Sequence, residues 1–410
     1  MKRDGTTADA VQGVVPGEVL VPMSIDEACA ALAELGAAGR ASVFVGGGTK
    51  LSLGAPPSRL DAVVRTTGLA RIVEYAPSDQ VITVEAGLTL GALQERLARD
   101  RQRLSLDAPW PERATIGGIV ATNSFGPLRA RSGAIRDLIL GVSLVRADGV
   151  LARSGGKVVK NVAGFDLPKL VCGSLGTLAL IAVVTLRVHP LPEASAARVV
   201  RGLDAAAVVA LASALRSAQL EPSALVARRD GPARPWELAL RFEGFGAAVE
   251  QQVTRLDALA PGHVGDQDGP ASAFAEHQRT REDARLRLKL AALPDALPAV
   301  ERALAALAAL HEGAELAWYP TLGLGFFSTV AAAGAAAEGE DETAIATAIA
   351  QARDDLRALG GSLTVEDAPA SLWGSLATWS APSALALHRA VKSRFDPGGL
   401  LAPGRFVEGI

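Results

Sequence analysis

The sequence has 410 residues, of which 49% are apolar and 21% are charged, and its formal net charge is −3 at pH 7. This length exceeds one ordinary hydrophobic core, so we expect a soluble protein with more than one domain. A chain so close to neutral lacks the basic face that binds nucleic acid or an anionic membrane, and we exclude both as principal partners.

Two further features limit the location and the cofactors. The N-terminus has no apolar signal-peptide core, and three glycines interrupt the longest apolar stretch, residues 321–337. We therefore expect no secretory signal, no integral membrane segment and a cytoplasmic location. Cys29 and Cys172 are the only cysteines, and two thiols cannot ligate an iron–sulfur cluster or a four-cysteine zinc site.

Short strands and helices alternate in the first half of the chain. Residues 19–35 predict an extended segment and then a helix, because Ser24 and Glu27 have the spacing of a capping box. The other elements expected here are a strand and glycine turn at 41–48, a strand at 60–67, a strand, turn and helix at 80–100, two strands across an Asp-Gly turn at 137–153, and a strand ending at a proline at 177–191.

The second half follows a different rhythm, with two β-α-β-β-α units between residues 198 and 367. This order predicts an antiparallel sheet covered by helices on one face, so the expected fold class is α+β. The low-complexity stretch at 331–342 is expected to be a mobile loop. Residues 383–406 predict a final helix followed by an end that is rich in proline and glycine.

The first candidate ligand-binding segment is "GGGTK" at 46–50, directly behind a predicted strand. Its backbone amides could converge on a phosphate or pyrophosphate, or its glycines could serve a tight turn with positive φ. The segment matches neither a Walker loop nor the GxGxxG fingerprint. A mononucleotide kinase and an NAD-dependent Rossmann enzyme are therefore disfavoured.

Two more segments consist largely of small residues. Residues 114–127 combine glycine, alanine and serine with the hydrogen-bonding side chains of Thr115 and Asn123. Such a backbone can lie against a flat ring, and close packing on a neighbouring element would explain it equally well. Residues 160–186 are punctuated by three further glycines. Each segment alone is weak evidence, whereas the three together indicate a site.

The order of these segments resembles the FAD-binding domain of the p-cresol methylhydroxylase (PCMH) and vanillyl-alcohol oxidase superfamily. A GGGT turn, a TIGGxxAxN segment, an AGFD segment and a GSxGTL segment follow one another between residues 18 and 192. Within the superfamily, the chain most resembles the FAD-binding accessory subunits of bacterial glycolate oxidases, through "RSGAIRDLILGV", "GGKVVKNVAGFDLPKL" and the tail "FDPGGLLAPGR". Residues 196–367 add little motif evidence.

The resemblance implies a flexible N-terminus at 1–17, a two-subdomain PCMH-type FAD-binding domain at 18–195, an α/β cap domain with an antiparallel sheet at 196–370, and a tail at 371–410 that returns to the FAD domain. The GGGTK turn would hold the pyrophosphate, and the TIGG segment would line the dinucleotide. The implied FAD-contacting residues are Gly46, Gly47, Gly48, Thr49, Lys50, Leu51, Pro109, Thr115, Gly117, Gly118, Ala121, Asn123, Ser132, Arg136, Asp137, Gly164, Asp166 and Ile181.

The same resemblance predicts how FAD is held and which features of catalytic relatives this sequence lacks. Residues 44–54 and 115–137 contain no histidine or cysteine, so we expect non-covalent FAD. The HxGDGN-type cluster that holds a divalent metal in relatives oxidising 2-hydroxy acids is absent from the sequence, so we predict no metal site and identify no catalytic residue. We expect the five histidines to lie at the surface or to be hydrogen-bonded. Further departures from the catalytic pattern are Leu175, Ala179, Val183 and Ala402.

Three functions remain open at this point. The first is an FAD-bearing accessory subunit of a multisubunit glycolate oxidase, which would work beside a catalytic flavoprotein and an iron–sulfur subunit and reach a membrane only through these partners. The second is a self-sufficient FAD-dependent dehydrogenase of D-lactate or glycolate, for which Arg129, Arg131 and Lys160 are candidates to bind the substrate carboxylate. The third is a structural subunit with a decayed FAD site, against which the intact GGGT and TIGG segments argue.

Overall fold

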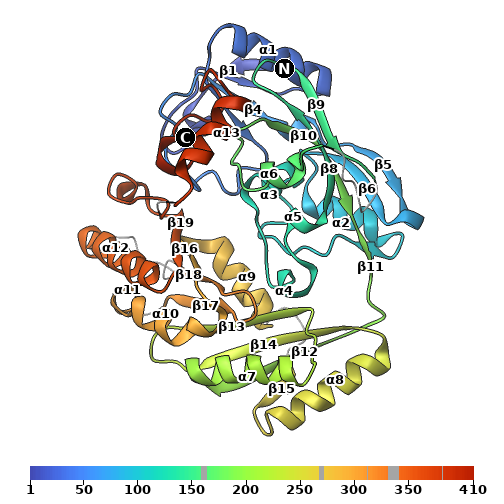
Figure 1. Ribbon diagram of the computed structural model, residues 1–410, viewed down its shortest axis with the longest axis vertical. Helices are drawn as coiled ribbons and strands as arrows, with labels where there is room; N and C mark the ends of the chain where they lie inside the picture. The colour runs from blue at the N-terminus through green and yellow to red at the C-terminus, as the bar shows by residue number, and fades with distance from the viewer. Residues whose placement is uncertain (158–163, 267–271, 312, 331–340, 381) are drawn as a thin grey trace. The chain divides into compact units, whose positions relative to one another are not determined.

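The computed structural model describes residues 1–157, 164–266, 272–311, 313–330, 341–380 and 382–410 (Figure 1). The chain forms two compact units. Unit 1 comprises residues 1–125, 133–191 and 381–410, and unit 2 comprises residues 126–132 and 192–380. Lys160 and residues 331–340 of the expected mobile loop lie outside the described residues. Within the described ranges, no helix is long and apolar enough to cross a membrane.

The first part of unit 1 is a four-stranded sheet with the order β1-β2-β4-β3. Strand β2 pairs in parallel with β4, and β4 pairs in parallel with β3. Helix α1 begins after Ser24, whose side chain accepts a hydrogen bond from the Glu27 amide, as the capping pattern predicts. The elements are β1 (Lys2–Asp4), β2 (Glu18–Leu20), α1 (Ile25–Ala37), β3 (Ser42–Val45) and β4 (Ala62–Arg65).

The N-terminus differs from the flexible segment that we expected. Strand β1 pairs with β2, and Val11 is fully buried in the small core beside β3 and β4. The buried carboxylate of Asp9 accepts hydrogen bonds from Arg3 at 2.6 Å and Arg65 at 2.9 Å. These partners come from distant parts of the sequence, so the local composition did not reveal that this segment is held in place.

The second part of unit 1 is an antiparallel five-stranded sheet with the order β5-β6-β10-β8-β9, drawn in blue and green in Figure 1. Leu93 of α2 and Ile116 of α3 pack on Ile82 and Val184 of the sheet, where they form the larger core of this unit. The elements are β5 (Ile72–Ala76), β6 (Val81–Glu85), α2 (Leu90–Ala98), α3 (Ile116–Thr122), α5 (Ile135–Leu138), β8 (Ile139–Val145), β9 (Leu151–Gly155), α6 (Leu167–Val171) and β10 (Leu180–Arg187). A short pair, β7 (Gln102–Arg103) and β11 (His189–Pro190), lies apart from this sheet.

Unit 2 contains an antiparallel eight-stranded sheet with the order β15-β12-β14-β13-β17-β18-β16-β19. Both predicted β-α-β-β-α units are present, and their strands form the two halves of the sheet. The strands are β12 (Ala194–Leu203), β13 (Ala224–Asp230), β14 (Trp236–Gly244), β15 (Val264–Asp266), β16 (Ala284–Ala291), β17 (Glu315–Tyr319), β18 (Leu324–Val330) and β19 (Ser362–Asp367). The helices are α4 (Arg129–Ser132), α7 (Ala205–Ser217), α8 (Gly246–Leu259), α9 (Ala273–Asp283), α10 (Leu297–Ala303), α11 (Ala305–Leu310) and α12 (Glu342–Ala358).

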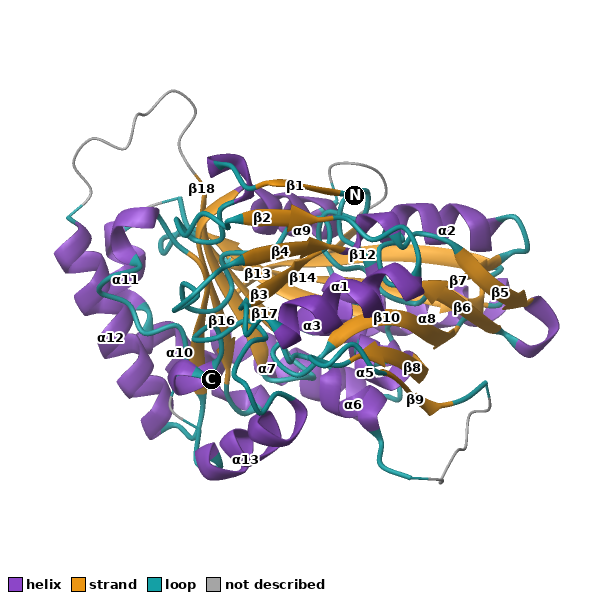
Figure 2. Ribbon diagram, turned by 90° about the horizontal axis from the view of Figure 1, so that it is seen from above, coloured by secondary structure: helices purple, strands orange, loops and turns teal. Residues whose placement is uncertain are grey.

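The two faces of this sheet differ in chemistry. Leu286, Leu288 and Leu290 of β16 belong to an apolar core shared with α7, α8 and α10 to α12, and Figure 2 shows α10, α11 and α12 grouped on one side of the strands. The alternating residues Arg287 and Lys289 belong to the other face. Helix α9 packs on β13, β16 and β18, so the expectation of helices on one face alone was wrong. Its polar sequence gave no sign of a buried stripe.

The C-terminal tail belongs to unit 1 from residue 381 onward, whereas residues 371–380 belong to unit 2. Helix α13 (Leu385–Phe395) ends just before the buried carboxylate of Asp396. Asp396 accepts hydrogen bonds from the amides of Leu400 at 3.0 Å and Leu401 at 2.7 Å, and it accepts one from Lys392 Nζ at 2.6 Å. Ser42 of β3 exchanges backbone hydrogen bonds with the tail, which therefore extends this sheet beside β3.

Candidate functional site

Most of the glycine-rich segments line one cleft in unit 1. It lies where the turn after β3 meets α3 and the loop that leads into β10. Predicted residues that line it are Gly46, Gly47, Gly48, Thr49, Lys50, Leu51, Thr115, Gly117, Gly118, Ala121 and Ile181. Residues that the motifs did not assign to cofactor binding also line it, namely Val43, Phe44, Leu53, Thr66, Thr122, Leu175, Gly176, Ala179 and Arg405.

The glycines of the GGGTK turn serve different purposes. A Cβ atom at Gly47 would lie 1.7 Å from the Arg113 carbonyl oxygen, and one at Gly46 would lie 2.1 Å from Thr115 Oγ1. Gly48 has φ +71°, which an L-residue rarely adopts, and its Cβ position is open apart from Leu51 at 3.7 Å. Close packing and positive φ thus explain all three glycines within the protein itself. Of these, positive φ was one of the two alternatives that the sequence left open for this turn, and close packing was not foreseen here.

Some backbone amides around the cleft donate hydrogen bonds to protein acceptors, and others do not. At the start of α3, the Gly117 amide donates to the Ala86 carbonyl at 2.7 Å, and the Gly118 amide donates to Thr115 Oγ1 at 3.3 Å. By contrast, the amides of Gly47, Gly48 and Thr49 have no protein acceptor among the described residues. These three residues are half-buried and line the cleft, so the turn presents donors that an anion can reach.

The charge of the cleft has one sign. In the described part of the chain, the charged side chains that line it are Lys50 and Arg405, and no carboxylate lines it. Arg405 is 3% exposed and donates to the carbonyls of Leu51 at 2.8 Å, Leu53 at 2.7 Å and Ala55 at 3.3 Å. Burial lowers the pKa of Arg405 to about 10, so the guanidinium remains cationic at neutral pH. The cleft therefore fits an anionic ligand.

The remaining predicted site residues do not line this cleft. Pro109 is buried elsewhere in unit 1, and Asn123 ends α3 with φ +48° and accepts from Cys172 Sγ at 3.8 Å. Ser132 belongs to unit 2. The others are exposed: Arg136, Asp137, which caps α5 through the Ala134 amide, Gly164, and Asp166, which caps α6 through the Lys169 amide.

The candidates for binding a substrate carboxylate are also accounted for. Arg131 pairs with Glu221 at 2.5 Å on the surface of unit 2, and Arg129 has a partner as well. Within the described residues, no group of three or more His, Cys, Asp or Glu side chains could hold a metal ion. The ligand-binding chemistry of unit 1 is therefore centred on the cleft.

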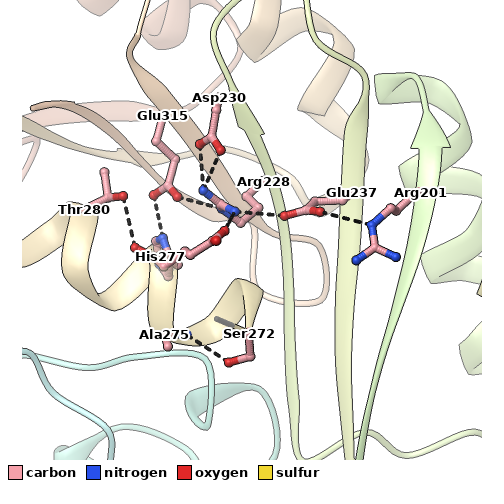
Figure 3. A network of polar contacts seen from close by, with 10 residues as sticks. Arg201, Arg228, Asp230, Glu237, Ser272, Ala275, His277, Thr280 and Glu315 are labelled. Carbon is pink, nitrogen blue, oxygen red and sulfur yellow. Dashed lines mark hydrogen bonds and ion pairs between the residues drawn. The ribbon is translucent and has the colours of Figure 1, made fainter. Parts of the chain in front are cut away.

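Unit 2 holds a separate buried network, which Figure 3 shows. Arg228 donates to Glu315 at 2.8 Å, to Glu237 at 2.9 Å and to both oxygens of Asp230 at 2.7 Å. His277 of α9 is fully buried between Glu315 Oε1 at 2.7 Å and the Tyr319 hydroxyl at 2.8 Å. The imidazole and the guanidinium hold the pKa of Glu315 below its usual value against the opposing effect of burial. His277 is thus a hydrogen-bonded structural histidine, one of the two alternatives predicted.

Comparisons with known proteins agree with this picture of unit 1. Residues 16–155 match the family model described as "FAD binding domain". Residues 16–155 therefore form an FAD-binding domain, and the predicted FAD-binding domain, fold class and cofactor FAD are confirmed.

Individual relatives extend the comparison. The chain is 38% identical over 154 residues to glycolate oxidase subunit GlcE of Escherichia coli, a match covering 37% of this chain and 43% of the relative. It is 39% identical over 146 residues to a D-lactate dehydrogenase of Archaeoglobus fulgidus, covering 35% and 32%. Each match therefore spans less than half of the relative's length. The fold is similar to that of alkyldihydroxyacetonephosphate synthase, with a TM-score of 0.72, 17% identity, and 98% of this chain and 82% of that chain covered.

Proposed function

We propose that the chain is the FAD-binding subunit of a multisubunit glycolate oxidase, which converts glycolate to glyoxylate, and that its own role is accessory, in electron transfer or assembly. The observation that carries the proposal is the 38% identity to the GlcE subunit over 154 residues. The acid-free cleft with Lys50 and Arg405 supports it, because FAD brings a pyrophosphate that needs hydrogen-bond donors and positive charge.

Different residues of the cleft would bind different parts of FAD. The amides of Gly47, Gly48 and Thr49 are available donors for the pyrophosphate, and Lys50 adds positive charge. Gly118 and Ala121 of α3 offer a wall without bulky side chains. When bound, FAD supplies the capacity to accept and pass on electrons. The segments 44–54 and 115–137 contain neither histidine nor cysteine, which supports non-covalent binding.

Two properties of the sequence support an accessory role. Oxidation of a 2-hydroxy acid needs a group that accepts the hydroxyl proton and a cation that holds the carboxylate. The histidine cluster that the resemblance implies for catalytic members is absent from all 410 residues. Two cysteines also cannot ligate an iron–sulfur cluster, so a catalytic flavoprotein and an iron–sulfur subunit are the proposed partners.

A second candidate function is a self-sufficient FAD-dependent dehydrogenase of 2-hydroxy acids. The 39% identity to a D-lactate dehydrogenase over 146 residues favours it specifically. The two candidates differ in what the isolated chain can do. The accessory subunit holds FAD without turnover, whereas the dehydrogenase reduces an electron acceptor on its own.

The deciding experiment uses the purified chain loaded with FAD. Acid precipitation should release the flavin into the supernatant, since no covalent bond is expected; yellow colour that stays in the pellet would contradict non-covalent binding. Dye reduction is then measured with glycolate and with D-lactate, for the chain alone and for a complex co-expressed with the two partners. We expect turnover only in the complex. Comparable rates for the isolated chain would establish the dehydrogenase and overturn the accessory role.

A further inference from the structure

The C-terminal tail forms part of the cofactor cleft. Ser42 of β3 bonds to the backbone of Leu400 at 2.8 Å and Ala402 at 2.7 Å, and the Ala55 amide donates to the Arg405 carbonyl at 3.0 Å. Lys392 ties the start of the tail to Thr177 at 2.8 Å and to Leu401 at 2.7 Å. The tail is therefore fixed along both the strand before the GGGTK turn and the loop after it.

The side chain of Arg405 is an uncompensated buried charge. A guanidinium has five N–H donors, and here three carbonyl oxygens of residues 51, 53 and 55 accept from it. Across the described ranges no carboxylate pairs with Arg405. Burial of an unpaired cation is unfavourable, as the lowered pKa of Arg405 reflects. Because Arg405 also lines the cleft, its charge is placed where an anionic ligand can pair with it.

The anion that fits is the one that the cleft is otherwise prepared for. Arg405 and Lys50 both line the cleft, and so do the residues of the GGGTK turn whose amides have no acceptor within the described part of the chain. We propose that Arg405 is a cofactor-binding residue whose charge neutralises the pyrophosphate of FAD, and that docking of the tail and binding of FAD stabilise each other. This inference rests on the proposed function of the cleft as the FAD site.

Mutual stabilisation follows from linkage. A ligand that binds only when the tail is docked shifts the docking equilibrium by its own binding free energy. FAD should therefore protect the backbone amides of residues 396–405 from hydrogen exchange. ADP, which contains a pyrophosphate but no flavin, should protect them as well, whereas adenosine should not. This measurement uses the unmodified full-length chain.

The direct test compares FAD with riboflavin, which lacks phosphates, by quenching of flavin fluorescence. Arg405→Met should weaken FAD binding by roughly 10- to 100-fold, the range expected for a charge-assisted hydrogen bond, and should change riboflavin affinity by less than about threefold. Arg405→Lys keeps the positive charge but lacks the planar guanidinium, so its FAD affinity should lie between those of the wild type and Arg405→Met. Arg353→Met is the matched control, because Arg353 of α12 is also buried and bonds to the Ala377 carbonyl, but in unit 2.

Each outcome decides the matter. A selective loss of FAD affinity in Arg405→Met, with Arg353→Met unchanged, supports the inference. Unchanged FAD affinity, or equal losses for FAD and riboflavin, would show that Arg405 only holds the loop together and would overturn it. If Arg405→Met fails to fold, equal exchange protection by ADP and adenosine in the unmodified chain overturns it instead. A wild-type chain that takes up no FAD would refute the proposed function and this inference together.

Discussion

Gly47 and Gly118 both line the cleft, yet the structure predicts opposite consequences for adding a methyl group to each. At Gly47 the new Cβ would lie 1.7 Å from the Arg113 carbonyl oxygen, about 2 Å inside an ordinary contact of ~3.5 Å. The loop that carries this oxygen is fixed, because the Arg113 and Ala114 amides donate to the Trp110 carbonyl at 2.9 and 2.7 Å. Gly47→Ala should therefore destabilise the fold of unit 1.

The expected size follows from the neighbours that must move. Overpacking of a rigid contact costs about 1–3 kcal/mol, and each loop hydrogen bond that breaks adds about 1 kcal/mol, so we expect a loss of about 3 kcal/mol in the free energy of unfolding. For a unit of about 200 residues, this lowers the melting temperature by roughly 6–12 °C. The loss should be present without FAD, because the obstructing atom belongs to the protein.

Gly118→Ala is the matched comparison. The nearest atom to its Cβ position is Thr115 Oγ1 at 3.2 Å, and alanine within a helix is favoured over glycine by about 0.5–1 kcal/mol. The unfolding free energy of the apo chain should stay within about 1 kcal/mol of wild type. The methyl group would occupy the cleft, however, and should weaken FAD binding by about tenfold or more.

The assay combines thermal unfolding of the apo chains by circular dichroism, hydrogen exchange of residues 41–66 and 113–122, and FAD titration. Wild-type stability of Gly47→Ala would refute the packing argument for this turn. Wild-type FAD affinity of Gly118→Ala would remove α3 from the cofactor site. A variant that loses stability and affinity together is attributed to folding, which is why the apo measurement comes first.

Two further predictions concern buried charges. Arg3 and Arg65 hold the pKa of Asp9 well below its usual range. On acidification, the Asp9 carboxylate is therefore protonated first in the unfolded chain. The stability that Asp9 contributes is present above its ordinary pKa of 3.8 and is lost as the pH falls below it. Asp9→Asn should melt lower at pH 7 and show a shallower acid slope, and an unchanged slope would contradict this. Glu315→Ala removes the carboxylate that His277 bonds to and one of several that Arg228 bonds to, and it should cost unit 2 about 3 kcal/mol. The exposed control Glu221→Ala should cost under about 1 kcal/mol; similar melting temperatures for both would refute the prediction.

The fold was predictable where local patterns determine it. The capping pair at Ser24 and Glu27, the Asp-Gly turn at 148–149 and the alternating leucines of β16 are local signals, and the structure has the helix, the hairpin and the strand that they predict. Strand β1 and helix α9 were not recognised. Their stability comes from partners distant in sequence, an ion cluster around Asp9 for the first and the polar face of an eight-stranded sheet for the second.

The lining of the candidate cleft was predictable to the extent that glycine residues mark it. Motif order placed Gly46, Thr115 and Gly118 together, and the structure lines one cleft with them. Arg405 was missed because it lies more than 350 residues from the turn in the sequence. The signal that could have found it is the tail motif "FDPGGLLAPGR", which contains a cation beside a glycine and was used only as evidence of resemblance.

The properties of the cleft also bear on the possibility of a decayed site. Leu175 lines it with φ +52°, a conformation unfavourable for a bulky side chain, and its amide donates to the Ala121 carbonyl at 2.9 Å. Arg405 is buried there without a carboxylate. Strain and unpaired charge both reduce stability, and a purely structural subunit gains nothing from either. An anionic cofactor that pairs with Arg405 would offset the cost of burying its charge, whereas it would not change the backbone conformation of Leu175, which several other non-glycine residues share.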